Sequence, residues 1–305
     1  MRLSRLPVPG SSGPSSAVPL FLRPKDSYLT CRDRDDGGGA QISARISTMI
    51  CARLKGLTYA HSPVSDVAHV PEGMTPAAWS QEWEDFFNLG AGEVTSTEIE
   101  ARGYPVVAVP KPHRFFPRSR RLQVVAHCHK VTDKHPEAWA DIAPLIREKY
   151  LLSPKPMLAG YDDEKVQIAV HLRRGDVGSS GRFSERFTED DLVLGRLQRV
   201  LDIVGAEQAT VRLFSQGQAD DFRSFTDLGV QLHLDDDVFE SFHHFVRSDV
   251  LFVAKSTFSY LGGMIGGNVC LCEPFWHPLL PEWLNADFED RAFRAALDRR
   301  LKGLA

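Results

Sequence analysis

The sequence has no long apolar run, no large excess of one charge and no dense set of cysteines. Apolar stretches never reach the roughly 18 residues that a membrane-spanning helix needs. A net charge of −4 argues against a strongly basic nucleic-acid-binding protein, so no nucleic-acid partner is expected. Five scattered cysteines do not make a disulfide scaffold. The absence of Asn-x-Ser/Thr sites is weak evidence against a glycosylated lumenal protein.

The first 25 residues differ in composition from the rest of the chain. They are rich in Pro, Ser and Gly, contain Arg2 and Arg5, and have no continuous apolar stretch. Their prolines interrupt any apolar core that a secretory signal would need. We expect a disordered tail over residues 1–25, with a transit peptide as the alternative.

From residue 27 onward, short apolar runs alternate with stretches of helical periodicity. Such alternation predicts parallel sheets joined by right-handed crossovers. Residues 151–165 contain Pro154, Pro156 and Gly160 and are typical of an interdomain linker. The predicted fold class is therefore α/β, with two Rossmann-like domains facing a cleft. Their predicted bounds are 26–155 and 156–305, and no internal repeat suggests a solenoid.

The expected elements follow from the apolar patterns. Strands are expected at residues 27–31, 57–60, 106–109, 122–126, 166–172, 210–214, 230–234, 250–253 and 269–272. Helices are expected at residues 40–54, 76–88, 136–150, 188–204, 219–228, 237–247, 257–265 and 287–301.

Residues 166–177, VQIAVHLRRGDV, contain the strongest local motif. An apolar strand leads directly into His171, Arg173, Arg174 and Asp176. Ligands of open α/β sheets bind beyond the carboxyl ends of the strands, and guanidinium groups match phosphate oxygens. Because side chains alternate along a strand, only one of the two arginines is expected to reach a phosphate directly. The alternative is a surface loop with a structural Arg–Asp pair.

Two further segments carry polar groups next to predicted helix starts. Residues 248–268 contain an apolar strand and then Ser256-Thr257-Phe258-Ser259, where hydroxyls and free N–H groups can bind an anion. The same residues can equally form a simple helix cap. Residues 36–41 read Asp-Gly-Gly-Gly-Ala-Gln before another helix. A glycine-rich loop by itself is usually a flexible turn.

Together these motifs resemble the superfamily of α1,2-, α1,6- and protein O-fucosyltransferases. The His-x-Arg-Arg-x-Asp motif, the late Asp and Ser-x-x-Ser motif and the glycine-rich loop occur in the family's order. The resemblance covers roughly residues 27–285, although Ala40 stands where many relatives have Asn. It implies the GT-B fold, with a first domain that shapes the acceptor site and a second domain that holds GDP-fucose.

The resemblance also implies roles for individual residues. His171 and Asp249 would hold the guanine, and Arg173 and Arg174 would neutralise the diphosphate of the leaving GDP. Asp176 and Glu185 are the nearest carboxylates to act as a base, with Glu185 the preferred candidate. A solvated loop charge is the alternative for Glu185. The nucleotide pocket would further contain Gly38, Gly39, Gln41, Ser256, Thr257, Phe258 and Ser259.

For three other features of the sequence, we prefer a structural role to a functional one. Asp235-Asp236-Asp237 resembles a metal motif, but Asp237 and Glu240 fit a capping box. His127, His129 and the pair at residues 243–244 have no second ligand pair at zinc spacing. The aromatic residues at 275–277 and 283 are expected to pack a returning chain. No metal site and no cofactor is therefore predicted, and GDP-fucose enters as donor substrate.

The resemblance as a whole implies a metal-independent, inverting glycosyltransferase. It would transfer fucose from GDP-fucose to a hydroxyl of a glycan or protein. The alternatives are a GT-B enzyme that uses another nucleotide sugar, a non-catalytic nucleotide-sugar-binding protein and a scaffold. The resemblance implies the ER or Golgi lumen, whereas the lack of a signal or anchor in this sequence leaves a cytoplasmic location open.

Overall fold

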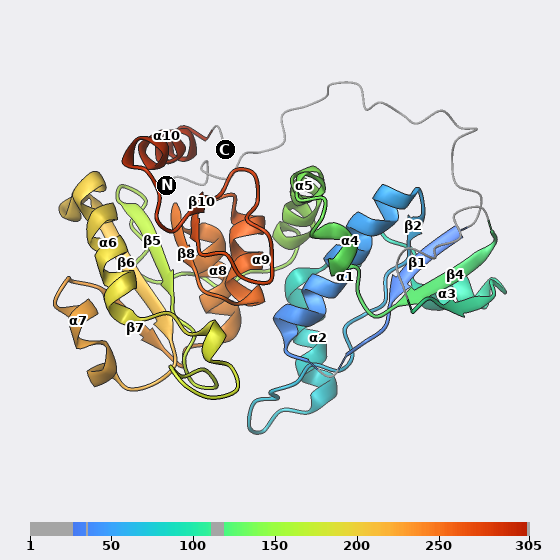
Figure 1. The fold of residues 1–305 in the computed structure, drawn as a ribbon. Coiled ribbons are helices and arrows are strands. Elements are labelled where there is room, and N and C mark those ends of the chain that lie inside the picture. The colour runs from blue at the N-terminus through green and yellow to red at the C-terminus, as the bar shows by residue number, and fades with distance from the viewer. Residues whose placement is uncertain (1–26, 35, 111–118, 304–305) are drawn as a thin grey trace. The chain divides into compact units, whose positions relative to one another are not determined.

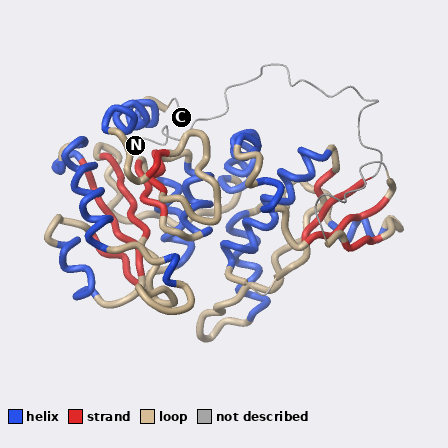
Figure 2. The backbone as a smooth tube through the Cα atoms, in the orientation of Figure 1, coloured by secondary structure: helices blue, strands red, loops and turns tan. Residues whose placement is uncertain are grey.

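The computed structural model describes residues 27–34, 36–110 and 119–303. The tail expected over residues 1–25 lies outside the described residues. The chain divides between Pro154 and Lys155 into two compact units, here called the N-terminal and C-terminal units. Both are α/β, with helices blue and strands red in Figure 2. Within the described residues, no helix combines the length and apolar character needed to cross a membrane.

The N-terminal unit contains a four-stranded parallel sheet in the order β2-β1-β4-β3. Its strand β1 pairs with β4 over five residues, and both lie at the centre of the sheet (Figure 1). The elements of this unit are β1 (Ser27–Cys31), α1 (Gly38–Lys55), β2 (Thr58–Tyr59), α2 (Pro76–Phe87), α3 (Ser96–Ala101), β3 (Val106–Ala108), β4 (Arg121–Val125), α4 (His129–Thr132) and α5 (Glu137–Leu151).

The boundaries of these helices follow from local chemistry. Helix α2 begins after Thr75, whose hydroxyl accepts the Ala78 N–H at 3.2 Å, and Pro76 occupies the first turn. Helix α1 ends at Gly56 with φ 63°, a left-handed conformation that favours glycine. Gly38 at the start of α1 is also required, because a Cβ there would lie 2.2 Å from the Trp83 ring.

The C-terminal unit is larger and has a six-stranded sheet of parallel strands. The strand order is β10-β9-β8-β5-β6-β7. Its elements are β5 (Val166–His171), η4 (Ser184–Arg186), α6 (Asp190–Val204), η5 (Ala206–Gln208), β6 (Ala209–Ser215), η6 (Ala219–Phe222), α7 (Arg223–Thr226), β7 (Gln231–Leu234), α8 (Val238–Arg247), β8 (Val250–Val253), α9 (Thr257–Gly266), β9 (Val269–Cys272), β10 (Leu284–Asn285) and α10 (Asp290–Leu301).

The chain winds outward from β5 in one direction and then in the other. Strands β6 and β7 follow on one side of β5, whereas β8, β9 and β10 follow on the opposite side. This is the strand order 3-2-1-4-5-6 of a doubly wound nucleotide-binding fold, and its direction reverses between β5 and β8. Strand β5 is buried along most of its length, as expected for a central parallel strand.

Helices cover the sheet of the C-terminal unit (Figures 1 and 2). Helix α6 contributes Val193, Leu197 and Val200 to a core shared with β5, β8 and α10. Helix α9 packs closely because its glycines leave room: a Cβ at Gly262 would lie 2.7 Å from Phe245, and one at Gly263 would lie 2.5 Å from the Cys270 sulfur.

The structure confirms the predicted class of two Rossmann-like α/β units built on parallel sheets. Most expected elements are present with ends shifted by one or two residues. The helix expected at 219–228 is instead two short pieces, η6 and α7. Helices α3 and α4 and strand β10 were not expected from the apolar pattern because each is short.

Candidate functional site

The carboxyl end of β5 meets the N-terminus of α9 in the C-terminal unit. Arg173, which follows β5, donates from its terminal Nη1 to Ser256 Oγ at 3.4 Å. Ser256 follows β8 and caps α9, since its hydroxyl accepts the Phe258 N–H at 3.3 Å. The two residues therefore meet at the reversal point of the strand order, where nucleotide ligands of doubly wound sheets bind.

A carboxylate fixes the direction of the Arg173 side chain. Asp176 accepts hydrogen bonds from Arg173 at 2.7 and 3.2 Å, and these bonds hold the pKa of the Asp176 carboxyl below its usual value. The Arg173 side chain remains 27% exposed and lines a small pocket. Asp176 therefore orients a guanidinium toward that pocket and is a weak proton acceptor.

Arg174 points elsewhere, in agreement with the expected alternation. Its guanidinium bonds the Thr188 carbonyl at 2.9 Å and the Asp190 carboxylate, and it lies over the Phe187 ring at 4.1 Å. Only 14% of the side chain is exposed. Of the two adjacent arginines, Arg173 faces the pocket and Arg174 holds the loop that leads into α6.

The pocket lies at the carboxyl ends of β5, β8 and β9. Its polar lining contains three arginines and one carboxylate, and the full set is His171, Leu172, Arg173, Arg186, Thr188, Val193, Arg196, Phe252, Val253, Ala254, Leu271, Glu273 and Ala286. Glu273 accepts from Arg196 at 2.5 Å and forms an ion pair with Lys255 at 2.9 Å. Burial disfavours its charge, but these two cations keep the pKa of the Glu273 carboxyl below its usual value.

His171 is enclosed on one side by aromatic rings. Its ring centroid lies 5.2 Å from that of Phe245 and 6.1 Å from that of Phe258. The buried Nδ1 has no hydrogen-bond partner among the described residues. Burial, together with the charges of Arg173 and Arg174, lowers the pKa of His171 to about 3. The imidazole is therefore neutral near pH 7.

Asp249 is not brought to this pocket, contrary to the expectation that it holds the same base as His171. It precedes β8 and so lies at the amino end of the strands, whereas His171 ends β5. Its carboxylate accepts the Gln167 N–H at 3.0 Å and lies 3.6 Å from the Arg300 Nε, and the residue is only 2% exposed. Because Asp249 precedes the predicted strand in the sequence, its location at the amino end of the sheet could have been predicted.

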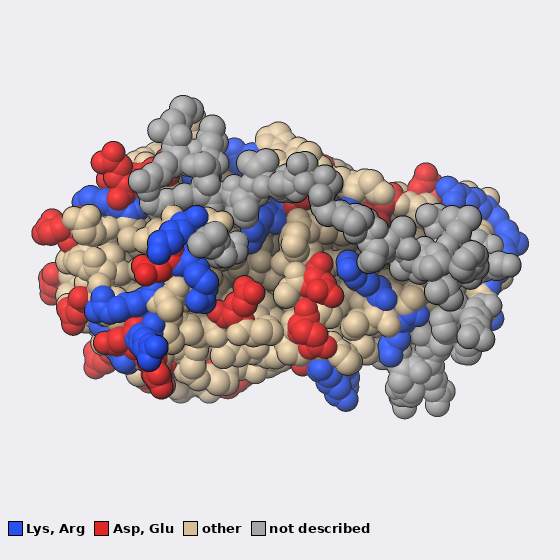
Figure 3. Space-filling view, turned by 90° about the horizontal axis from the view of Figure 1, so that it is seen from above, with Lys and Arg blue, Asp and Glu red and all other residues tan. Residues whose placement is uncertain are grey.

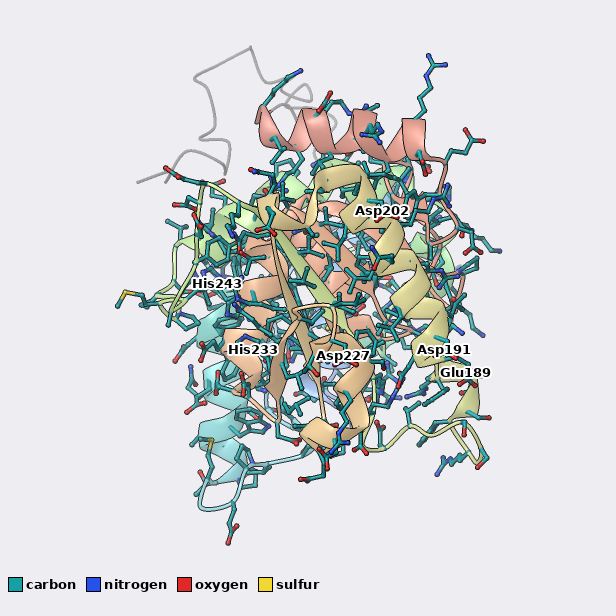
Figure 4. All side chains as sticks on the ribbon, turned by 90° about the vertical axis from the view of Figure 1, so that its left-hand side faces the viewer. Glu189, Asp191, Asp202, Asp227, His233 and His243 are labelled. Carbon is teal, nitrogen blue, oxygen red and sulfur yellow. The ribbon has the colours of Figure 1, made fainter. Side chains whose placement is uncertain are left out.

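Figure 4 labels several acidic and histidine side chains of the C-terminal unit. Glu189 and Asp191 lie at the beginning of α6, and Asp202 lies near the other end of the helix. His233 and His243 lie on β7 and α8 in the same view. Among the described residues, no group of three or more His, Cys, Asp or Glu is arranged to hold a metal ion.

The remaining residues expected after β8 have different surroundings. Thr257 Oγ1 lies 3.0 Å from His277 Nε2, whereas Phe258 packs against Phe242 and Phe245. Ser259 is fully buried, and its hydroxyl has no partner among the described residues. Ser256 accepts a hydrogen bond from Arg173, so it both caps the helix and borders the site.

The glycine-rich segment has structural contacts within the N-terminal unit. Gln41 is fully buried and donates to the Asp66 carbonyl at 2.8 Å and to the Arg34 carbonyl. Gly38 packs against Trp83, and Gly39 continues the first turn of α1. These contacts give Gly38 and Gln41 a structural role within the N-terminal unit.

Glu185 lies outside the pocket, whereas three residues that the sequence did not single out line it. Glu185 is 63% exposed and is not among the pocket residues, whereas its neighbour Arg186 is. Arg196 and Glu273 also line the pocket. Glu273 directly follows β9, a position at the carboxyl edge of the sheet that could have identified it.

The acidic run Asp235–Asp237 has a structural role at the start of α8. Asp237 caps α8 by accepting from the N–H groups of Phe239 and Glu240, both at 2.9 Å. On the face of the molecule drawn in Figure 3, positive and negative side chains are interspersed. This distribution fits a local cationic pocket better than a broad basic surface.

No protein-family model and no curated protein matches the sequence. Among solved structures, it is similar to POFUT1 in complex with GDP, with 11% identity, a TM-score of 0.47, and coverage of 80% of this chain and 95% of that chain. It is also similar to the fucosyltransferase NodZ from Bradyrhizobium, with 12% identity, a TM-score of 0.40, and coverage of 78% and 93%. Likeness at this level carries no conclusion about activity or substrate.

Proposed function

We propose that the chain is a glycosyltransferase whose C-terminal unit binds a nucleotide sugar, with GDP-fucose as the donor. The observation that carries the proposal is the meeting of Arg173 with Ser256 where the strand order reverses. A guanidinium beside a helix N-terminus is suited to a diphosphate, because both present N–H donors and positive potential. The choice of GDP-fucose comes from the motif resemblance.

In this proposal, the acceptor hydroxyl oxygen attacks the anomeric carbon of fucose from the side opposite GDP. The new carbon–oxygen bond forms as the bond to the β-phosphate oxygen breaks, and the hydroxyl proton passes to water. Arg173 stabilises the charge that develops on the departing diphosphate, and Asp176 orients Arg173. The N-terminal unit contributes to the acceptor site, with a glycan or protein as acceptor.

A second candidate is a protein that binds the nucleotide sugar without transferring it. Glu273 favours this candidate, because it is the carboxylate among the pocket residues and is already paired with Arg196 and Lys255. Glu185 is exposed beside Arg186, and Asp176 is held by Arg173. A transfer assay separates the candidates, since both require binding but only the enzyme releases GDP in an acceptor-dependent manner.

The test is calorimetric titration of the full chain with GDP, GDP-fucose, GDP-mannose, UDP and ADP, with and without Mg²⁺. We expect GDP and GDP-fucose to bind more tightly than UDP and ADP, and Mg²⁺ to make little difference. Fucose transfer to a mixed panel of glycans and peptides is then measured by GDP release. Failure of every nucleotide to bind would overturn the proposal.

A further inference from the structure

Arg186 is held over the pocket by two aromatic rings. It ends the short helix η4, and its guanidinium carbon lies 4.4 Å from the Phe183 ring centroid and 4.9 Å from that of Trp276. Trp276 is 44% exposed and is followed by His277, whose Nε2 lies 3.0 Å from Thr257 Oγ1. The rings thus hold the guanidinium from two different loops.

The charge of Arg186 is poorly compensated. It forms an ion pair with Glu185, at 3.7 Å from Nε, and that side chain is 63% exposed. The buried Nε of Arg186 has no hydrogen-bond partner among the described residues. By contrast, Arg196 in the same pocket is neutralised by Glu273 at 2.5 Å and Asp287 at 2.8 Å.

Arg186 is also electrostatically close to the carboxylate that orients Arg173. Its positive charge helps to keep the pKa of Asp176 below the usual value, after the larger effect of Arg173. Two guanidinium groups therefore act on the carboxylate of Asp176, whereas Glu185, the other carboxylate near Arg186, is largely exposed to solvent. Two guanidinium groups close to one pocket favour the binding of an anion with more than one negative charge, such as a diphosphate.

We propose that Arg186 is a second phosphate-binding residue, which with Arg173 takes the diphosphate of the nucleotide. This inference rests on the proposed function and assigns to Arg186 the role that the motif resemblance gave to Arg174. Trp276 is a positioning residue in this scheme: stacking holds the guanidinium in place, so less side-chain freedom is lost when phosphate binds.

Arg182 provides a matched control for Arg186. It lies in the same loop and over the same Phe183 ring, at 5.1 Å, but it is exposed and is not among the pocket residues. The full chain and its Arg186→Gln and Arg182→Gln variants are titrated with GDP, inorganic pyrophosphate and guanosine. We expect Arg186→Gln to weaken GDP and pyrophosphate by roughly tenfold or more, because a charge-assisted hydrogen bond is lost. Guanosine binding should be unchanged, and Arg182→Gln should stay within about twofold for all three ligands.

The outcomes separate this inference from the proposed function. If the wild-type chain binds GDP and Arg173→Gln weakens it, but Arg186→Gln behaves like Arg182→Gln, the role of Arg186 is overturned and the nucleotide site stands. If the wild-type chain binds neither GDP nor pyrophosphate, both proposals fail. Thermal unfolding of each variant shows whether it is folded, and Arg186→Lys, which keeps the charge, should recover part of the lost affinity.

A substitution of Trp276 tests the positioning role by a separate readout. Trp276→Leu should weaken pyrophosphate by about threefold through a less ordered Arg186, and Trp276→Phe should restore most of the affinity. In the Arg186→Gln background, Trp276→Leu should have no further effect on pyrophosphate. An equal additional loss in that background would contradict the positioning role.

Discussion

Two arginines, one from each unit, are used in different ways. In the N-terminal unit, Arg45 has no exposed side-chain surface and makes five hydrogen bonds, to the carbonyls of Gln41, Ser62 and Pro63 and to two side chains. In the C-terminal unit, Arg173 makes three hydrogen bonds and is 27% exposed. A guanidinium has five N–H donors. The five hydrogen bonds of Arg45 all go to its own unit, whereas Arg173 has donors left that can bind a ligand.

The largest expected effect is on stability, at Arg45. Arg45→Leu removes the cation that faces Asp33 at 2.5 Å and leaves several buried carbonyls without donors. We expect the free energy of unfolding to fall by about 3–5 kcal/mol, as for a broken buried ion pair. Urea unfolding measures this loss. Arg53→Ala, at an exposed position near the end of the same helix, should stay within about 0.5 kcal/mol. Equal midpoints for the two variants would contradict the role of Arg45.

Substitutions of the two adjacent arginines at the end of β5 should have different effects: one should weaken nucleotide binding, and the other should lower the stability of the fold. Arg173→Gln should weaken GDP by roughly tenfold or more and change the free energy of unfolding by less than about 1 kcal/mol, since its pair with Asp176 is partly exposed. Arg174→Gln should instead lower stability by about 1–3 kcal/mol through the loss of its bonds to Thr188 and Asp190. Calorimetry and urea unfolding on the same preparations test both parts. The reverse pattern would show that the assignments are exchanged.

The apolar pattern predicted the C-terminal unit well because its strands are continuous and buried. Strands β8 and β9 have the predicted bounds, Val250–Val253 and Val269–Cys272. Helix α3 has no such pattern, although Thr95 and Glu98 form a capping box that its sequence contains. Short elements depend on caps and neighbours more than on periodicity, so they were missed.

The candidate site was only partly predictable for a different reason. The motif located the carboxyl end of β5, and the alternation of side chains predicted that one arginine would face a ligand. Arg186 and Glu273 reach the same pocket from loops, through contacts with Trp276 and Lys255 that no local pattern encodes. The position of Asp249 follows from strand direction, which the resemblance alone did not take into account.

A smaller effect distinguishes the structural glycine of α1 from its neighbour. Gly38→Ala places a Cβ 2.2 Å from the Trp83 ring, so the packing must shift, and we expect a loss of about 1–3 kcal/mol in the free energy of unfolding. Gly37→Ala is the control, because its Cβ would lie 4.0 Å from His69 and its φ of −66° suits alanine. A loss of stability in Gly37→Ala alone would contradict the packing explanation and point instead to a requirement for loop flexibility.

The smallest effect on stability at neutral pH is expected for a substitution of His171, and His61 provides the comparison. In the N-terminal unit, His61 is bonded through both nitrogens, to Tyr59 at 3.1 Å and to Glu84 at 2.7 Å. His171 lies among aromatic rings with a buried Nδ1 that lacks a partner in the described part of the chain. His171→Phe should therefore change stability at pH 7 by less than about 1 kcal/mol, whereas His61→Phe should cost more at every pH.

The difference in stability between the wild-type chain and His171→Phe should change as the pH falls. The pKa of His171 determines the direction of that change. Burial lowers that pKa to about 3, below the value of about 6.5 in the unfolded chain, so the unfolded chain binds more protons between these values. Stability of the wild-type chain then falls as the pH drops through this range. His171→Phe should reduce the fall by roughly 1 kcal/mol per pH unit, although His243 and His244, whose pKa values are lowered in the same direction, keep part of it. Urea unfolding from pH 7 to pH 4 measures the slopes, and parallel curves for the two chains would show that His171 is not held neutral by its surroundings.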